Sequence, residues 1–198
     1  MLDNYSVVDI ETTGLSIKGN RITEVAALKV SGTRIVDKFE MLVNPEVDIP
    51  AEITQLTGID NNLVRKAKTI DKVLPKFLDF LGDSIVVAHN ATFDYNFLDY
   101  NINRYLNKRL ENKSLCTVKL ARKLFPDITS CRLSSLCNYF DIENVNAHRA
   151  MSDCFVTNKL FLKFQAIMHN HGIEDERSIF EFVGTPGKKL NLCVSNFT

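Results

Sequence analysis

Hydrophobic and polar positions alternate in three consecutive segments near the start of the chain. The segments are "YSVVDI", "RITEVAALKV" and "TRIVDKFEMLV", and the alternation predicts three β-strands. The connections between them are short, which favours an antiparallel meander. After the proline-bounded loop "NPEVDIP", the segment "AEITQLTGI" predicts a short helix that ends near Gly58.

From residue 69 onward the pattern changes to an alternation of helices and strands. "TIDKVLPKFLDFLGD" has helical spacing, with a kink or restart expected at Pro75, and "SIVVAH" is typical of a buried parallel strand. "FDYNFLDYNINRYLNKRL" and "RAMSDCFVTNKLFLKFQAIMHN" predict long helices, "SLCTV" a strand, and "KLARKLF" and "RLSSLCNYF" short helices. This order predicts an α/β fold in which helices cover the faces of a mixed sheet.

Length and composition favour one domain with a substantial core. The chain has 198 residues, of which 45% are hydrophobic, and no low-complexity tract. We expect a domain over residues 1–171 and a C-terminal appendage of unknown role over 172–198, with strand-like pieces around a Thr-Pro-Gly-Lys-Lys turn. Lys and Arg number 24, and so do Asp and Glu, so any contact with nucleic acid should be short or local.

The chain shows no targeting or membrane signal. The start "MLDNYSVVDI" has no basic region followed by an apolar run, and no apolar stretch approaches the roughly 20 residues that span a bilayer. The five cysteines form no CxxC pair, which favours free thiols in a reducing compartment. We therefore expect a cytoplasmic protein without a membrane partner.

Acidic residues occur where apolar strands would bury them. Asp9 and Glu11 are two positions apart on the first strand and so point to the same face. Such a pair can bind a cation, share a proton or mark a solvent-exposed strand end, and for the pair alone the exposed end is the simplest interpretation. Asp94, His148 and Asp153 stand near the heads of two later helices, where an acid can simply cap the helix. Together the five residues predict one site.

Three segments now resemble a known family. "VVDIETTGL", "HNATFDYNFL" and "AHRAMSDC" are similar to the three motifs of the DEDD exonucleases in their His-containing (DEDDh) branch, which includes proofreading subunits and domains of bacterial replicative polymerases. The connecting segments "RITEVAALKV", "IPAEITQLTGI" and "LCTVKLARKLFP" also resemble this family, so the likeness covers roughly residues 5–166. It implies a ribonuclease H-like fold with a mixed five-stranded sheet flanked by helices. It also implies 3′→5′ removal of nucleotides from single-stranded DNA ends.

The resemblance assigns roles to individual residues. It implies that Asp9, Glu11, Asp94 and Asp153 bind metal and that His148 is the general base. His89, at the end of the strand "IVVAH", is the competing base, and a structural hydrogen bond to the backbone is the simpler interpretation of it. Four carboxylates repel one another, and their hard oxygen atoms favour two Mg²⁺ or Mn²⁺ ions over zinc. Thr12, Thr13 and Leu15 would contact the terminal nucleotide, Asn90 would hydrogen-bond it and Phe93 would stack on a base. Ordinary core packing is the alternative for Leu15 and Phe93.

Other functions stay open at this point. Basic residues at positions 104–132 could line the approach of a phosphate backbone or form a solvated helix face. A 3′→5′ exoribonuclease shares these motifs, and a non-catalytic module that binds a DNA polymerase is a second alternative. The sequence carries no signal for the oligomeric state, and it does not separate a free-standing nuclease from a proofreading subunit.

Overall fold

A mixed β-sheet forms the centre of the molecule. The computed structural model describes residues 1–190. Its strands are β1 (Asn4–Thr12), β2 (Ile22–Ser31), β3 (Arg34–Asn44), β4 (Lys68–Thr69), β5 (Ile85–Ala88) and β6 (Ser114–Cys116), in the order β4-β3-β2-β1-β5-β6. β1, β2 and β3 are the antiparallel meander that the alternation predicts, and β5 and β6 continue it in parallel. The five expected strands are confirmed. The sixth, β4, has two residues, too few for a pattern to reveal.

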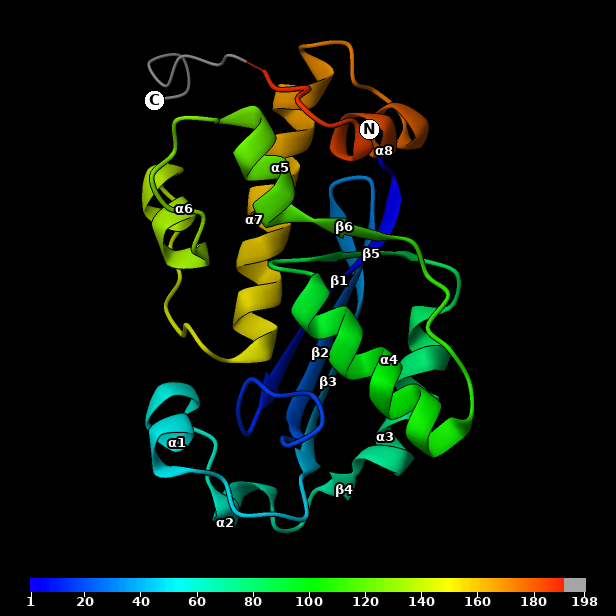
Figure 1. Cartoon of the computed structure of the whole chain (residues 1–198), viewed down its shortest axis with the longest axis vertical. Helices are drawn as coiled ribbons and strands as arrows, with labels where there is room; N and C mark the ends of the chain where they lie inside the picture. Colours follow the sequence, from blue (N-terminus) through cyan, green and yellow to red (C-terminus); the bar gives the residue numbers. More distant parts are fainter. Residues whose placement is uncertain (191–198) are drawn as a thin grey trace.

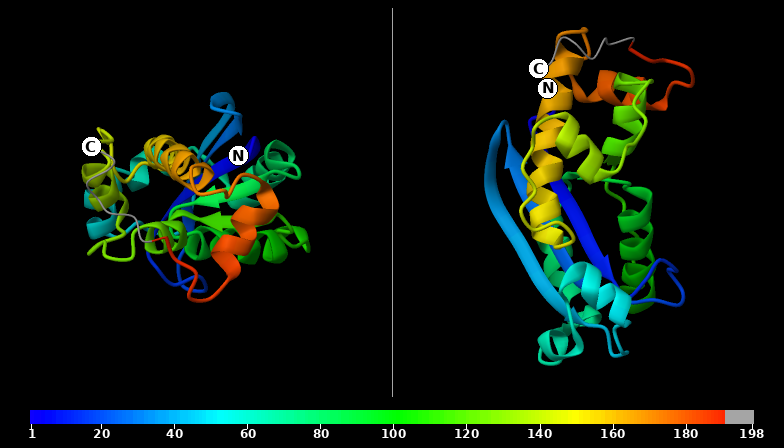
Figure 2. Two further views of the ribbon diagram at one scale, coloured as in Figure 1. Left: turned by 90° about the horizontal axis from the view of Figure 1, so that it is seen from above. Right: turned by 90° about the vertical axis from the view of Figure 1, so that its left-hand side faces the viewer.

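Helices cover both faces of this sheet (Figures 1 and 2). They are α1 (Ala51–Thr57), α2 (Asn61–Val64), α3 (Ile70–Leu81), α4 (Thr92–Leu106), α5 (Thr117–Leu124), α6 (Leu133–Tyr139), α7 (Ala150–His169) and α8 (Glu176–Gly184). α5, α6, α7 and α8 share one hydrophobic core with Tyr5 and Val7 of β1, whereas α3 and α4 share another with Val8 and Ile10. Because side chains alternate along a strand, Asp9 and Glu11 lie on the α7 face.

Of two predicted helix breakers, Gly58 ends its helix and Pro75 does not. α1 ends at Gly58, whose φ of 71° is left-handed, as the sequence predicts. α3 does not restart at Pro75 but continues through it. Val73, Leu74 and Phe77, on both sides of the proline, are buried in the same core, and this packing outweighs the one backbone hydrogen bond that proline removes.

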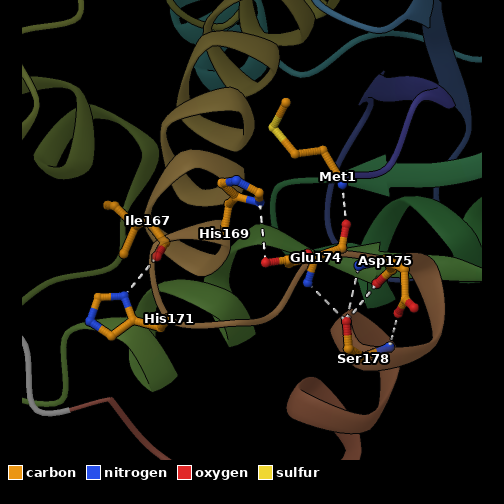
Figure 3. Close-up of polar contacts among 7 residues, drawn as sticks. All are labelled: Met1, Ile167, His169, His171, Glu174, Asp175 and Ser178. Carbon is orange, nitrogen blue, oxygen red and sulfur yellow. Dashed lines mark hydrogen bonds and ion pairs between the residues drawn. The ribbon is translucent and has the colours of Figure 1, made fainter.

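The segment after α7 folds as a helix, so the strand-like pieces expected from "SIFEFV" are wrong. α8 begins with a capping box in which the Asp175 carboxylate accepts from the Ser178 N–H (Figure 3). Ile179 and Phe182, three residues apart, are buried in the same core as α7. Tertiary packing and the cap thus override the strand propensity of aromatic and β-branched residues. The apolar run at 191–198 lies outside the described residues.

His169 and His171 are exposed. Figure 3 shows His171 donating from Nδ1 to the Ile167 carbonyl at 2.8 Å and His169 beside Glu174, with Nδ1 and Oε1 3.9 Å apart. The ammonium group of Met1 donates to the backbone carbonyl of Glu174. The contact of Met1 joins the residues before β1 to the turn between α7 and α8.

Within residues 1–190, no helix combines the length and apolar character needed to cross a membrane. The cysteines in this range, Cys116, Cys131, Cys137 and Cys154, are free thiols, as predicted, and Cys193 lies outside it.

Candidate active site

Three carboxylates from two elements meet at the end of β1. Asp9 and Glu11 project from β1, and Asp153 is the fourth residue of α7, which packs against this face of the sheet. Each supplies one oxygen atom, and these atoms all lie within 4.8 Å of one another. An all-oxygen donor set of this kind suits a hard divalent cation such as Mg²⁺, Mn²⁺ or Ca²⁺.

Asp94 joins this group from the opposite side of β1. It is the third residue of α4, only 3% exposed, and its Oδ1 accepts from the Ile10 N–H at 3.2 Å. The N-cap of α4 is Ala91, so helix capping does not explain the acid. Its charge raises the pKa values of Asp9 and Glu11, which places it within electrostatic reach of both.

The pKa values of these acids are strongly raised. Burial, and then the charges of Asp94, Glu11 and Asp153, hold the pKa of Asp9 well above its usual range. Burial and neighbouring carboxylates raise the pKa of Glu11 to about 8, and burial raises that of Asp94 to about 7. Ionising these acids would therefore concentrate negative charge in the folded chain, and the donor set fits a divalent metal that would compensate it.

His148 lies in an exposed loop that wraps Asp153. Its backbone N–H donates to Asp153 Oδ2 at 3.1 Å, and Asn144 Nδ2 donates to Asp153 Oδ1 at 3.1 Å. The backbone of His148 has a φ of 64°, an uncommon conformation for a residue with a side chain. Burial raises the pKa of Asp153, while the bond from Asn144, the bond from His148 and the charge of His148 lower it. The backbone of His148 is thus held beside Asp153.

Sequence reasoning missed a fifth acid at this site. Glu24 of β2 is paired with Glu11 across the sheet, is fully buried, and accepts from Arg149 Nη2 at 2.8 Å and from the Ala150 N–H at 2.9 Å. The available signal was a charged residue in the otherwise apolar run "RITEVAAL". Asn144 had no comparable signal, because a polar residue in a polar loop is unremarkable.

The loop after β1 presents an exposed leucine. The Thr12 hydroxyl donates to the Gly14 carbonyl at 2.7 Å, and the Thr13 hydroxyl donates to Asn20 Oδ1 at 3.2 Å. Both threonines are buried, so they brace the loop from inside. Leu15 is 84% exposed, which excludes the core packing that was its alternative interpretation.

A pocket of about 700 Å³ opens beside the acids. Its lining includes Asn90, His148 and Asp153 together with Arg122 and Arg132. The wall of the pocket therefore combines one of the acids, Asp153, and a histidine with two guanidinium groups, a combination suited to a phosphodiester.

The two remaining candidates near the pocket have protein partners. His89 lines it as well, but its Nδ1 lies 2.8 Å from the Thr117 hydroxyl, and burial lowers its pKa to about 4. Phe93 is partly buried and packs on Phe97, with ring centroids 4.9 Å apart. His89 is therefore a weak base.

Residues 6–161 match the model of the RNase_T exonuclease family. The chain belongs to this family. It is 38% identical over 176 residues to the DNA polymerase III subunit epsilon of Aquifex aeolicus, a match that covers 88% of this chain and 87% of that protein. These matches confirm the resemblance to DEDD exonucleases and favour an exonuclease over a purely binding module.

Larger relatives contain this family domain as a small part. The chain is 41% identical over 180 residues to the DNA polymerase III PolC-type protein of Clostridium perfringens, which covers 90% of this chain and 12% of that protein. The chain thus spans about an eighth of such relatives.

Solved exonuclease structures share the fold. Exonuclease X in complex with 5′ overhanging duplex DNA superimposes with a TM-score of 0.67 at 29% identity, over 87% of this chain and 93% of that one. E. coli Exonuclease I in complex with a dA16 oligonucleotide superimposes with a TM-score of 0.74 at 17% identity, over 91% of this chain and 45% of that one. The ribonuclease H-like fold is thereby confirmed.

Proposed function

We propose that the chain is a metal-dependent 3′→5′ exonuclease that removes nucleoside monophosphates from single-stranded DNA ends in the cytoplasm, as the proofreading or repair partner of a DNA polymerase. The observation that carries this proposal is the convergence of Asp9, Glu11 and Asp153 within 4.8 Å. The similarity to a polymerase III epsilon subunit and to nucleases bound to overhanging and single-stranded DNA supports the choice of DNA. Residues 1–171 form the nuclease domain in this proposal, and 172–198 the appendage.

The acids would hold two Mg²⁺ or Mn²⁺ ions. Asp9, Glu11 and Asp153 would bind one ion, and Asp9 with Asp94 would bind the second, since Asp94 uses only Oδ1 for the Ile10 N–H. When bound, the ions activate the attacking water and stabilise the leaving 3′ oxygen. The raised pKa values of Asp9 and Glu11 mean that their ionised forms are unfavourable in the folded chain without a cation.

His148 would accept the proton of the attacking water. The loop presents its ring at the edge of the pocket, and the bond from its N–H to Asp153 fixes the backbone beside the acids. Because an exposed imidazole exchanges its proton readily with solvent, the base can reset after each turnover. His89, with a pKa near 4, is too weak a base for this role.

The terminal nucleotide would lie between the loop after β1 and the head of α4. Leu15 is free to pack against a base, while Thr12 and Thr13 hold the loop that presents it. Asn90 faces the pocket and would hydrogen-bond the nucleotide, and Phe93 would stack on the next base.

The test is digestion of matched single-stranded DNA oligonucleotides labelled at the 5′ or the 3′ end. With Mg²⁺ or Mn²⁺, the 3′ label should appear at once as a mononucleotide, while the 5′-labelled strand shortens stepwise. Chelator should abolish both results. Release of the 5′ label as a mononucleotide before the strand has shortened, or faster digestion of the matched RNA, would contradict the proposal.

A further inference from the structure

A second, basic hollow adjoins the pocket of the active site. It has a volume of about 260 Å³ and is lined by Lys119, Arg122, Lys123, Lys188, Lys189 and residues 183–187. Arg122 of α5 lines both hollows, so the two meet at this residue. None of these lining residues is acidic, and no Asp or Glu follows Glu181 in the sequence. The chain as a whole has a formal net charge of zero, so this is a local concentration of positive charge.

The segment after α8 is fixed in place to form this hollow. Lys123 Nζ donates to the carbonyls of Phe182 at 2.7 Å and Thr185 at 2.5 Å, and the Leu190 N–H donates to the Lys123 carbonyl at 2.9 Å. Lys123 is thus committed to the protein, whereas Lys188 and Lys189, between these anchors, are exposed. Figure 1 shows α8 and this segment at the end of the molecule opposite α1 and α2.

The remaining cations of the hollow have no carboxylate partner. Within residues 1–190, Lys119, Arg122, Lys188 and Lys189 form no ion pair. Earlier in the basic stretch at 104–132, by contrast, Arg109 pairs with Asp99 and Lys113 with Glu176, each at 2.8 Å. Lys119 and Arg122 of α5 therefore keep their charge available for an anion.

We propose that Arg132, Arg122, Lys119, Lys188 and Lys189 form a basic track that binds the phosphodiester backbone of the substrate strand on the 5′ side of the terminal nucleotide. This inference rests on the proposed function, which places the 3′ end at the acids. The acids repel the phosphate backbone of the strand. Cations that line the path of the strand away from the acids therefore stabilise its binding. Arg132 and Arg122 lie in the first pocket, and the three lysines continue the line to the segment after α8. Residues 184–190 would therefore contribute to binding of the substrate strand.

The test compares two variants that each remove two adjacent positive charges. Lys188→Gln with Lys189→Gln alters the basic track, and Arg65→Gln with Lys66→Gln is the matched control, since that pair is exposed and follows α2 at the opposite end. Fluorescence anisotropy measures binding of 5′-labelled oligothymidylates of increasing length, with chelator present to prevent cleavage. For the track variant, the slope of log K against log salt should become shallower by roughly 1.4, about 0.7 for each phosphate that a lysine no longer neutralises. Its gain in affinity with length should also stop at shorter strands.

Two outcomes overturn the basic track. One is a track variant whose salt slope and length dependence equal those of the unaltered chain, and the other is an equal loss in the control variant. Hydrolysis of the p-nitrophenyl ester of thymidine 5′-monophosphate by the unaltered chain tests the proposed function separately, because this substrate has no 5′ strand. If the chain does not hydrolyse this ester but the salt slopes change as expected, the proposed nuclease activity is wrong and the basic track stands as a binding surface.

Discussion

Arg149 clamps Glu24 with its guanidinium from the position directly after His148. Nη2 lies 2.8 Å from Oε1 and Nε 3.3 Å from Oε2, and the Ala150 N–H adds a bond to Oε2 at 2.9 Å. Glu24 is buried in β2 opposite Glu11, whereas Arg149 is the N-cap residue of α7. The pair therefore ties the loop of the candidate base to the sheet that carries the candidate metal ligands.

Replacing Glu24 should damage both stability and turnover. Glu24→Ala leaves the Arg149 guanidinium and the Ala150 N–H without their acceptor, and we expect a loss of roughly 3 kcal/mol in the free energy of unfolding, measured with urea. Glu24→Gln keeps an acceptor and should lose less stability. If Glu24 positions His148, Glu24→Gln should still lower kcat more than it raises KM. A variant with an unchanged kcat and altered stability alone would show a purely structural role.

Two single variants should distinguish a loss of metal binding from a loss of proton transfer. Asp9→Asn replaces a central carboxylate by a neutral amide, so it should abolish both activity and the rise in Tm on adding Mn²⁺. His148→Gln should keep most of the Tm rise and lower kcat by roughly 10²–10⁴, the usual contribution of a general base. His89→Gln is the control and should lose much less activity, because a group with a pKa near 4 is a poor base. A larger loss in His89→Gln than in His148→Gln would reverse the assignment.

The meander, the buried parallel strand and the main helices follow from sequence because their patterns are long and periodic. Val7 and Val8 already indicate a strand covered on both faces. Elements set by tertiary contacts did not follow: β4 has two residues, and α8 contains strand-like residues that a capping box and the core turn into a helix.

The candidate site also contains residues that the sequence revealed and residues that it did not. Asp9 and Glu11 were visible because charged residues in an apolar strand violate its pattern, Asp153 was visible through the motif that it shares with the family, and the structure brings the three together. Glu24 violated the same pattern but belongs to none of the family motifs, so only the observed ion pair with Arg149 gives it a role. The basic track joins α5 to the segment after α8, residues more than sixty positions apart, and no local pattern encodes such a contact.

Leu15 should affect substrate binding and leave folding unchanged. Its side chain is 84% exposed, so Leu15→Ala removes no core packing. If a base covers it, removing this apolar packing, worth about 1.4 kcal/mol, should raise KM for single-stranded DNA roughly tenfold. Phe93→Ala provides the contrast, because Phe93 packs on Phe97 and its loss should also lower Tm. An unchanged KM in Leu15→Ala would remove this residue from the substrate site.

The stability of the metal-free protein should fall as the pH rises from 6.5 to 8. Glu11, with a pKa of about 8, and Asp94, with a pKa of about 7, keep their protons in the folded chain at pH values where the unfolded chain has lost them. The folded state then binds more protons, so raising the pH through these pKa values favours unfolding. His89 has the opposite shift, to about 4, and its effect is confined to pH values below its ordinary pKa of 6.5.

Divalent cations should reverse this loss. Mn²⁺ compensates the carboxylates once they ionise, and it competes with protons, so the Tm increase on adding Mn²⁺ should be larger at pH 8 than at pH 6.5. Differential scanning fluorimetry of chelator-treated protein, with Mn²⁺ added back at each pH, measures both effects. Glu11→Gln, which cannot ionise, should flatten the fall in Tm and reduce the response to Mn²⁺ at pH 8. A metal-free protein whose Tm rises across this range would mean that the acids are ionised and compensated by other groups, and the cation site inferred from their convergence would lose its electrostatic basis.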